Sequence, residues 1–76
     1  MDLRITPHAR QRMHQRSITE DDIRHAIENA TSKDVTPTTS IRYRGPGVNG
    51  RSLKVWTVPD DPDSKTKVIK SAAWEE

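Results

Sequence analysis

The segment SITEDDIRHAIENA, residues 17–30, decides the fold because it carries the clearest helix signal in the chain. Thr19 is a good N-cap residue, and the acidic residues that follow it stand where the helix dipole favours negative charge. Ile18, just before the cap, is placed to pack on Ile23. The apolar face continues at helical spacing through Ile23, Ala26, Ile27 and Ala30. The segment therefore predicts a helix that covers a core.

A second helix is predicted on the N-terminal side of this segment. Thr6 is a suitable N-cap, and Pro7 fits the first helical position, where its missing N–H is not needed. Ala9 and Met13 form a narrow apolar stripe, and the helix extends to about Arg16. The N-terminal part of the chain thus predicts two helices joined by a tight link.

After Asn29 the hydrophobic pattern changes from helical to alternating, which indicates strands. We expect strands at residues 33–36, 41–44, 52–58 and 66–73. Turn formers at 45–50 predict an antiparallel hairpin, and residues 59–64 predict a second connection of the same kind. The predicted fold is α+β, a single domain over residues 1–76, with two N-terminal helices packed on a three- or four-stranded antiparallel sheet in the order ααββββ.

The composition predicts a small core. Only 30% of the 76 residues are hydrophobic, and the chain has neither Phe nor Cys. A chain of this size buries little surface, so we expect a second copy in a homodimer, or another protein partner, to cover more of it. Apolar runs are too short for a membrane span, and we expect a cytoplasmic protein without contact to a membrane.

The charges are segregated along the chain although their sum is only +2. Residues 3–18 contain four arginines and no acid, and residues 35–59 contain four further cations and no acid. Acidic residues cluster at 20–22 and at Asp60, Asp61 and Asp63. Such separation creates local positive fields, which suit an anionic partner, although solvated charged faces give the same pattern.

Strict alternation assigns the strand residues to two faces of the sheet. Toward the helices it places Ile41, Tyr43, Leu53, Val55, Ile69 and Ala73. On the other face it places Arg42, Arg44, Lys54, Trp56, Lys70, Ala72 and Trp74. Cations that neutralise phosphate and rings that stack on unpaired bases predict binding of single-stranded RNA on this face. Alternatively, the two tryptophans pack into the protein or form a dimer contact.

The best candidate for catalysis is a helical flank with one imidazole and two guanidinium groups. His8, Arg12 and Arg16 recur every four residues and so lie along one side of the first helix. A histidine can accept or donate a proton near neutral pH while arginines hold a phosphate. Two alternatives remain open: His8 hydrogen-bonds a carbonyl at the helix–sheet junction, or Arg16 forms an ion pair with Asp22.

Other kinds of chemistry find no support in the sequence. The three histidines fall on different faces and no Cys is present, so we expect no metal site and no cofactor. His14 and His25 lie on polar faces, and we expect both to be exposed to solvent without a role. Tyr43, Arg44 and Lys54 remain candidates to approach the first helix from the sheet.

Residues 5–23 resemble a bacterial family known as a domain of unknown function. Its N-terminal signature is H-A-x-x-R-M-x-x-R-x-I, followed by an acidic and an aliphatic residue. The matching residues here are His8, Ala9, Arg12, Met13, Arg16, Ile18, Asp22 and Ile23.

The order of helices and strands also resembles the RelE and ParE toxins and the wider barnase, EndoU, colicin and RelE group of ribonucleases. This resemblance implies a small metal-independent endoribonuclease, or a relative that kept the fold and lost the activity. As a toxin it would act on RNA and could have a cognate antitoxin or another protein as its partner. A non-enzymatic accessory or regulatory protein, phage-borne or not, that binds nucleic acid or protein through the same basic face is the alternative. A purely structural interaction module is a further one.

Overall fold

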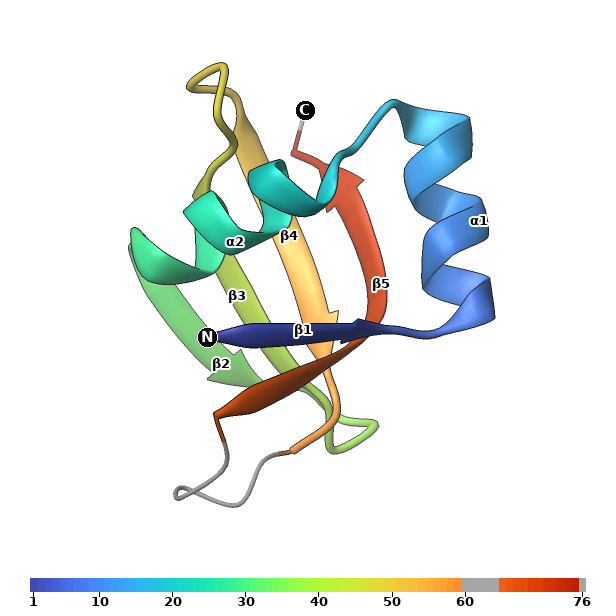
Figure 1. Cartoon of the computed structure of the whole chain (residues 1–76). Helices are drawn as coiled ribbons and strands as arrows, with labels where there is room; N and C mark the ends of the chain where they lie inside the picture. The colour runs from blue at the N-terminus through green and yellow to red at the C-terminus, as the bar shows by residue number, and fades with distance from the viewer. Residues whose placement is uncertain (60–64, 76) are drawn as a thin grey trace.

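The computed structural model of the protein describes residues 1–59 and 65–75 (Figure 1). The elements follow in the order β1 (Asp2–Ile5), α1 (Pro7–Arg16), α2 (Glu20–Glu28), β2 (Ser32–Val35), β3 (Ile41–Pro46), β4 (Ser52–Thr57) and β5 (Thr66–Trp74). The predicted α+β class is confirmed. The expected connection at 59–64 and the acidic residues Asp60, Asp61 and Asp63 lie outside the described residues, apart from Pro59.

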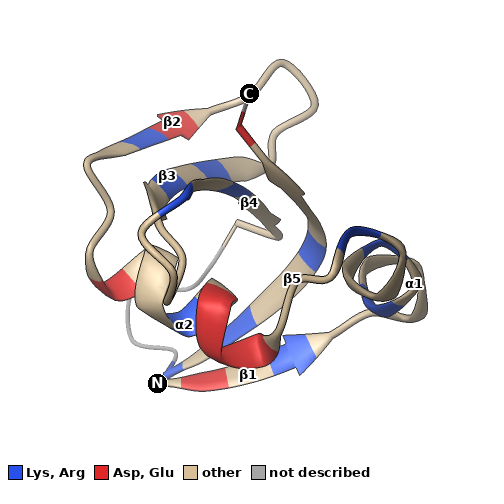
Figure 2. Ribbon diagram, turned by 90° about the horizontal axis from the view of Figure 1, so that it is seen from above, with Lys and Arg blue, Asp and Glu red and all other residues tan. Residues whose placement is uncertain are grey.

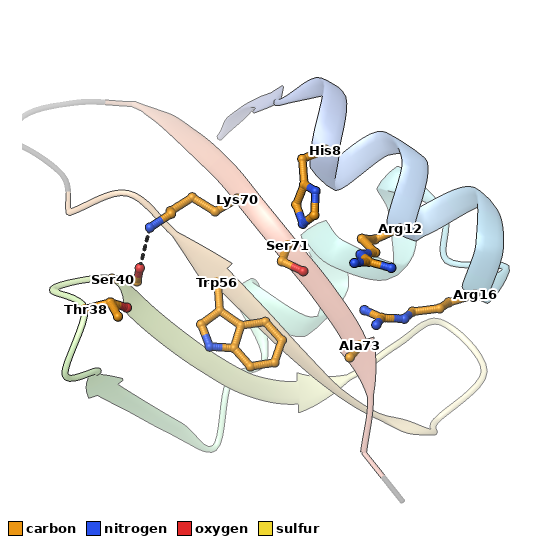
Figure 3. A pocket seen from close by; sticks show the side chains of 9 residues that line it. All are labelled: His8, Arg12, Arg16, Thr38, Ser40, Trp56, Lys70, Ser71 and Ala73. Atoms are coloured by element: carbon orange, nitrogen blue, oxygen red, sulfur yellow. Dashed lines mark hydrogen bonds between the residues drawn. The ribbon is translucent and has the colours of Figure 1, made fainter.

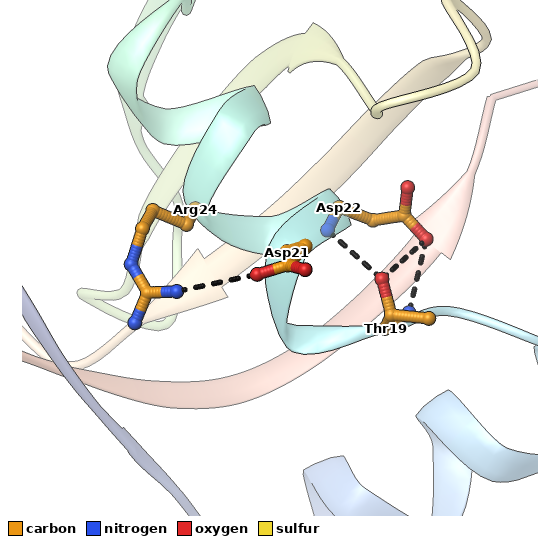
Figure 4. Close-up of polar contacts among 4 residues, drawn as sticks. All are labelled: Thr19, Asp21, Asp22 and Arg24. Atoms are coloured by element: carbon orange, nitrogen blue, oxygen red, sulfur yellow. Dashed lines mark hydrogen bonds and ion pairs between the residues drawn. The ribbon is translucent and has the colours of Figure 1, made fainter.

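Both helices begin where the caps predicted. The Thr6 hydroxyl accepts a hydrogen bond from the N–H of Ala9. α1 ends at Arg16, and the C-cap residue Ser17 has a left-handed backbone with φ 55°. At α2, Thr19 and Asp22 form a capping box in which each side chain bonds the other residue's backbone N–H (Figure 4). The helical part of the prediction therefore follows from local sequence alone.

The sheet is larger than predicted and mixed. Five strands lie in the order β1-β5-β4-β3-β2, and the pairs from β2 to β5 are antiparallel. The prediction of a three- or four-stranded, purely antiparallel sheet is wrong because it omitted β1, which pairs in parallel with β5. A parallel pair needs a long crossover, and here almost the whole chain forms it. β1 lies beside the first residues of β5 and leads from the N-terminus toward α1 (Figure 1).

The β3–β4 hairpin is confirmed, but its turn is shorter than expected. β3 continues through Pro46, and Gly50 takes the positive φ of 84° that suits glycine. Gly45, expected in the turn, lies inside β3 directly beneath α2. A Cβ atom there would collide with the carbonyl oxygen of Ala26, so the absence of a side chain lets α2 lie on the strand.

The core lies between the helices and one face of the sheet. It comprises Ala9, Met13, Ile18, Ile23, Ala26, Tyr43, Leu53, Val55, Ile69 and Ala72. The expected apolar stripe of α1 is confirmed, and both members of the expected Ile18–Ile23 contact are buried in this cluster. Within the described residues, every helix is too short and polar to cross a membrane.

A β-bulge in β5 changes the predicted faces at the end of the sheet. Trp56 pairs with Ser71, but the next residue of β4, Thr57, pairs with Ile69, which leaves Lys70 as the extra residue. A bulge moves all following side chains to the opposite face. Ala72 is consequently buried and Trp74 packs against the core, whereas Ala73 lies on the open face. The predicted faces of Ala72, Ala73 and Trp74 are therefore wrong.

Candidate active site

A concave pocket of about 460 Å³ lies between α1 and the open face of the sheet (Figure 3). It is lined by His8, Arg12, Arg16, Thr38, Ser40, Trp56, Lys70, Ser71 and Ala73. The structure thus brings the whole predicted flank of α1 together with two residues of the predicted RNA-binding face, Trp56 and Lys70. None of the lining residues carries a negative charge.

Hydrogen bonds to β5 at both ends of α1 aim its basic flank at this pocket. At the start, the N–H and the hydroxyl of Thr6 both donate to the carbonyl of Ile69, at 3.2 and 3.0 Å. At the end, Arg16 Nη1 donates to the carbonyl of Ala72 at 2.7 Å, and Trp74 Nε1 donates to the carbonyl of Arg16 at 2.7 Å. These bonds attach α1 to β5 before and after the bulge, and they therefore fix the rotation of α1 about its own axis.

The His8 ring is exposed and points into the pocket (Figure 3). Its ring nitrogens have no hydrogen-bond partner among residues 1–59 and 65–75, so the alternative in which His8 bonds a carbonyl is wrong. An exposed imidazole whose ring nitrogens have no protein partner can exchange protons with a bound ligand. Arg12, one helical turn on, is half-buried and bonds Gln15 at 3.2 Å.

Arg16 anchors α1 rather than pairing with Asp22. Its bond to Ala72 uses one of five guanidinium N–H donors and leaves the rest of the group at the rim of the pocket. The Asp22 carboxylate instead accepts bonds from Thr19 and from the N–H of Val48. The Arg16–Asp22 ion pair is therefore a wrong expectation, because the carboxylate serves the cap of α2 and the β3–β4 turn.

The bulge places two consecutive polar residues of β5 on the sheet side of the pocket. Lys70 and Ser71 are consecutive, yet both side chains line the pocket, which regular alternation does not allow. Lys70 Nζ donates to the hydroxyl of Ser40 at 2.8 Å, and Ser40 is only 2% exposed. The ammonium group is thus held at the rim opposite α1, with the Trp56 ring between the two sides (Figure 3).

Four predicted residues of the RNA-binding face lie outside the pocket. Arg42 pairs with Asp34 at 3.6 Å, and Arg44 pairs with Glu75 at 3.7 Å. Lys54 Nζ lies 5.8 Å from the centre of the Trp56 ring. Trp74 packs against the core, with Arg51 over its ring. Figure 2 shows that cations recur along the strands, with acidic residues on β2 and at the end of β5.

Sequence reasoning missed the hydroxyl groups of the pocket. Thr38 and Ser40 belong to the turn between β2 and β3, where Thr39 has a positive φ of 62°, and no periodic pattern marks such residues. Ser71 becomes visible only once the bulge is known. Tyr43, a candidate to approach α1, is buried on the helix side of the sheet and does not line the pocket. Lys70 is a sheet residue that supplies a polar group opposite α1.

Two other predictions concern the remaining histidines and metals. His25 is exposed as expected, but its Nδ1 contacts the carbonyl of Pro46 at 2.8 Å, so it links α2 to the end of β3. His14 is exposed at the end of α1. In the described part of the chain, no three residues of the types His, Asp and Glu come together in a way that can hold a metal ion.

Comparison with known proteins adds one relationship to this geometry. No curated protein and no solved structure matches the chain. A family described as a domain of unknown function, DUF4258, matches residues 5–74, which include β5, both helices and every residue that lines the pocket. The chain therefore belongs to the DUF4258 family.

Proposed function

We propose that this protein is a small metal-independent endoribonuclease that cleaves RNA in the pocket between α1 and the sheet. The observation that carries the proposal is the placement of the exposed His8 ring, which has no hydrogen-bond partner among the described residues, beside Arg12 and opposite Lys70. A proton-transfer group between two cations is what cleavage of a phosphodiester by its own 2′-hydroxyl needs.

The proposed reaction assigns one task to each group. His8 takes the proton of the 2′-hydroxyl, and the 2′-oxygen attacks the adjacent phosphorus. Arg12 and the remaining N–H groups of Arg16, at the rim of the pocket, neutralise the charge that develops on the phosphate oxygens. The bond from phosphorus to the 5′-oxygen breaks, and this oxygen takes a proton from the Lys70 ammonium. The products are a 2′,3′-cyclic phosphate and a 5′-hydroxyl end.

The cellular role that we propose is that of a RelE-like toxin acting in the cytoplasm, with a cognate antitoxin as its partner. Support comes from the element order, in which two helices precede the antiparallel strands, and from a basic pocket beside the first helix. An inhibitor protein that presents acidic side chains to His8, Arg12 and Lys70 would block the same pocket.

The test is a cleavage assay on single-stranded RNA in EDTA with His8→Ala and His8→Gln beside the wild type. We expect both variants to lose about 100- to 10,000-fold in rate, because a general base contributes that much, while circular dichroism and RNA binding stay unchanged. His14→Ala is the matched control, since it removes an imidazole from the same helix outside the pocket. We expect it to cleave like the wild type.

The growth of cells that express these variants tests the toxin role. We expect the wild type and His14→Ala to inhibit growth and His8→Gln to be harmless. Full cleavage by a folded His8→Gln variant would end the catalytic proposal. RNA binding without cleavage by the wild type would favour the alternative of a non-enzymatic binding protein.

A further inference from the structure

We infer that the pocket takes one unpaired nucleotide, with its base on the Trp56 ring and its phosphate between Arg12 and Lys70, and that the adjoining sheet face adds no phosphate contacts. This inference rests on the proposed function for its choice of RNA as the ligand. Its consequence is a short footprint and a requirement for single strands.

The shape of the pocket supports a single nucleotide. A volume of about 460 Å³ lies within the range of pockets for one small molecule, and a double helix is far wider. Trp56 lies on the pocket floor between α1 and the turn that carries Thr38 and Ser40 (Figure 3). A base can place its flat face on this ring only after it has left a helical stack.

The hydroxyl groups around the ring suit the edge of a base or a ribose. Thr38 and Ser71 both line the pocket with Trp56, and Ser71 is the residue paired with Trp56 across β4 and β5. A hydroxyl both donates and accepts a hydrogen bond, so these groups can meet donors or acceptors on a nucleotide. Lys54, whose ammonium lies near the ring, belongs to the same strand as Trp56 and lies outside the pocket lining.

The ion pairs on the rest of the face support a short footprint. Arg42 and Arg44 would extend a phosphate path beyond Trp56, but Asp34 and Glu75 stand beside their guanidinium groups. These partly exposed pairs add little stability. They instead lower the positive electrostatic potential of this face, because each carboxylate offsets the arginine charge that would attract a phosphate. In the described part of the chain no acid pairs with Arg12, Arg16 or Lys70, so these three cations of the pocket keep their positive charge.

The experiment measures binding without cleavage. The probe is a 12-nucleotide RNA with 2′-fluoro groups, which leave no hydroxyl to attack phosphorus, used single-stranded and annealed to its complement. We expect the single strand to bind, to quench tryptophan fluorescence, and to be displaced by adenosine 3′-monophosphate. We expect Trp56→Ala to weaken binding about 5- to 150-fold, the loss typical of one stacked base, and Trp56→Phe to bind but show no quenching.

The salt dependence separates the pocket from the remaining sheet face. The one or two phosphates of a single bound nucleotide give a slope of about −0.7 to −1.4 in log affinity against log salt, whereas six phosphates along the sheet face give about −4. We expect Arg12→Gln with Lys70→Gln to flatten the slope, and Arg42→Gln with Arg44→Gln to leave it unchanged. Glu75→Gln with Asp34→Asn is the matched reverse pair, and we expect it to steepen the slope.

The outcomes distinguish this inference from the proposed function. Equal affinity for the duplex, unchanged binding by Trp56→Ala, or a flatter slope on loss of Arg42 and Arg44 would each overturn the one-nucleotide pocket, whatever the cleavage assay shows. Binding and quenching as expected, combined with no cleavage of an unmodified strand, would leave the inference standing and refute the endoribonuclease.

Discussion

Trp74, the last residue of β5, holds the last residue of α1: its indole Nε1 donates a 2.7 Å hydrogen bond to the carbonyl oxygen of Arg16. The carbonyl groups at the end of a helix have no partner within the helix, so this bond satisfies one of them. Arg16 in turn donates from its side chain to the carbonyl of Ala72. The end of α1 and the end of β5 are therefore fixed as one unit.

The first prediction follows from this contact. We expect Trp74→Phe to lower the free energy of unfolding by about 1 kcal/mol, because it removes the hydrogen bond and keeps an aromatic ring in place. Urea unfolding measures the loss. Trp56→Phe is the control, since its ring lies in the open pocket, and an equal loss in both variants would contradict the role of the Trp74–Arg16 bond.

The second prediction concerns the start of α1. Thr6 caps the helix through Ala9 and bonds the carbonyl of Ile69 with the same hydroxyl. We expect Thr6→Ala to lower the free energy of unfolding by about 1–2 kcal/mol and Thr6→Ser to change it little, because serine keeps the hydroxyl. Thermal unfolding compares them. A Thr6→Ser variant as unstable as Thr6→Ala would show that the methyl group matters instead.

The third prediction tests the close approach of α2 to β3. We expect Gly45→Ala to destabilise the fold by about 1–3 kcal/mol, because its methyl group would meet the backbone carbonyl of Ala26, which cannot move without shifting the helix. Gly50→Asn serves for comparison, since that position is open and asparagine tolerates a positive φ. Chemical denaturation of the two variants should differ clearly, and equal stabilities would be inconsistent with the contact.

The fourth prediction concerns the pH dependence of stability at Asp22. Burial acts to raise the pKa of Asp22. Hydrogen bonds from the N–H groups of Thr19 and Val48 and from the Thr19 hydroxyl, together with the charge of nearby His25, outweigh burial and lower that pKa. The ionised carboxylate therefore stabilises the folded state above the ordinary value of 3.8, and this contribution is lost as the pH falls through the lowered pKa.

Its test is a series of unfolding measurements between pH 6 and pH 2 for the wild type and two variants. We expect Asp22→Asn to be less stable by about 1–3 kcal/mol at pH 6, with a weaker pH dependence below 3.8, because it loses charge-assisted bonds. Asp21→Asn is the matched control: its side chain is 83% exposed and forms an ion pair with Arg24, at 3.5 Å (Figure 4). An unchanged pH profile in Asp22→Asn would contradict the prediction.

The fifth prediction separates His25 from the pocket. We expect His25→Ala to lower the free energy of unfolding by about 1 kcal/mol, because its ring nitrogen binds the Pro46 carbonyl, and to cleave RNA at the wild-type rate. His8→Ala should show the reverse pattern. Melting curves and cleavage rates measured on the same preparations decide the matter, and loss of cleavage in a folded His25→Ala variant would enlarge the proposed site.

Local signals in the sequence were sufficient for the helices and for one side of the site. The caps at Thr6 and Thr19 fix where the helices begin, and the four-residue spacing of His8, Arg12 and Arg16 places them on one flank. These features depend on residues only three or four positions apart. They therefore need no knowledge of the tertiary structure.

The missed features depend on contacts between distant residues. β1 has only two apolar residues, Leu3 and Ile5, and becomes a strand through its parallel pairing with residues 66–69. The bulge in β5 exists because of the register against β4, which the alternation of a single strand cannot reveal. Thr38 and Ser40 reach the pocket only through the path of the turn at the start of β3.

The extra residue in β5 also changes what a deletion would do to this protein. Removing one residue from an inner strand normally inverts everything beyond it, but removing Lys70 would restore the regular order, with Ile69 and Ala72 still facing inward and Ser71 outward. Lys70 is thus an inserted residue whose removal leaves the inward and outward order of its neighbours unchanged. A chain of this family shortened at this point would keep its hydrophobic centre and lose a cation from the pocket rim.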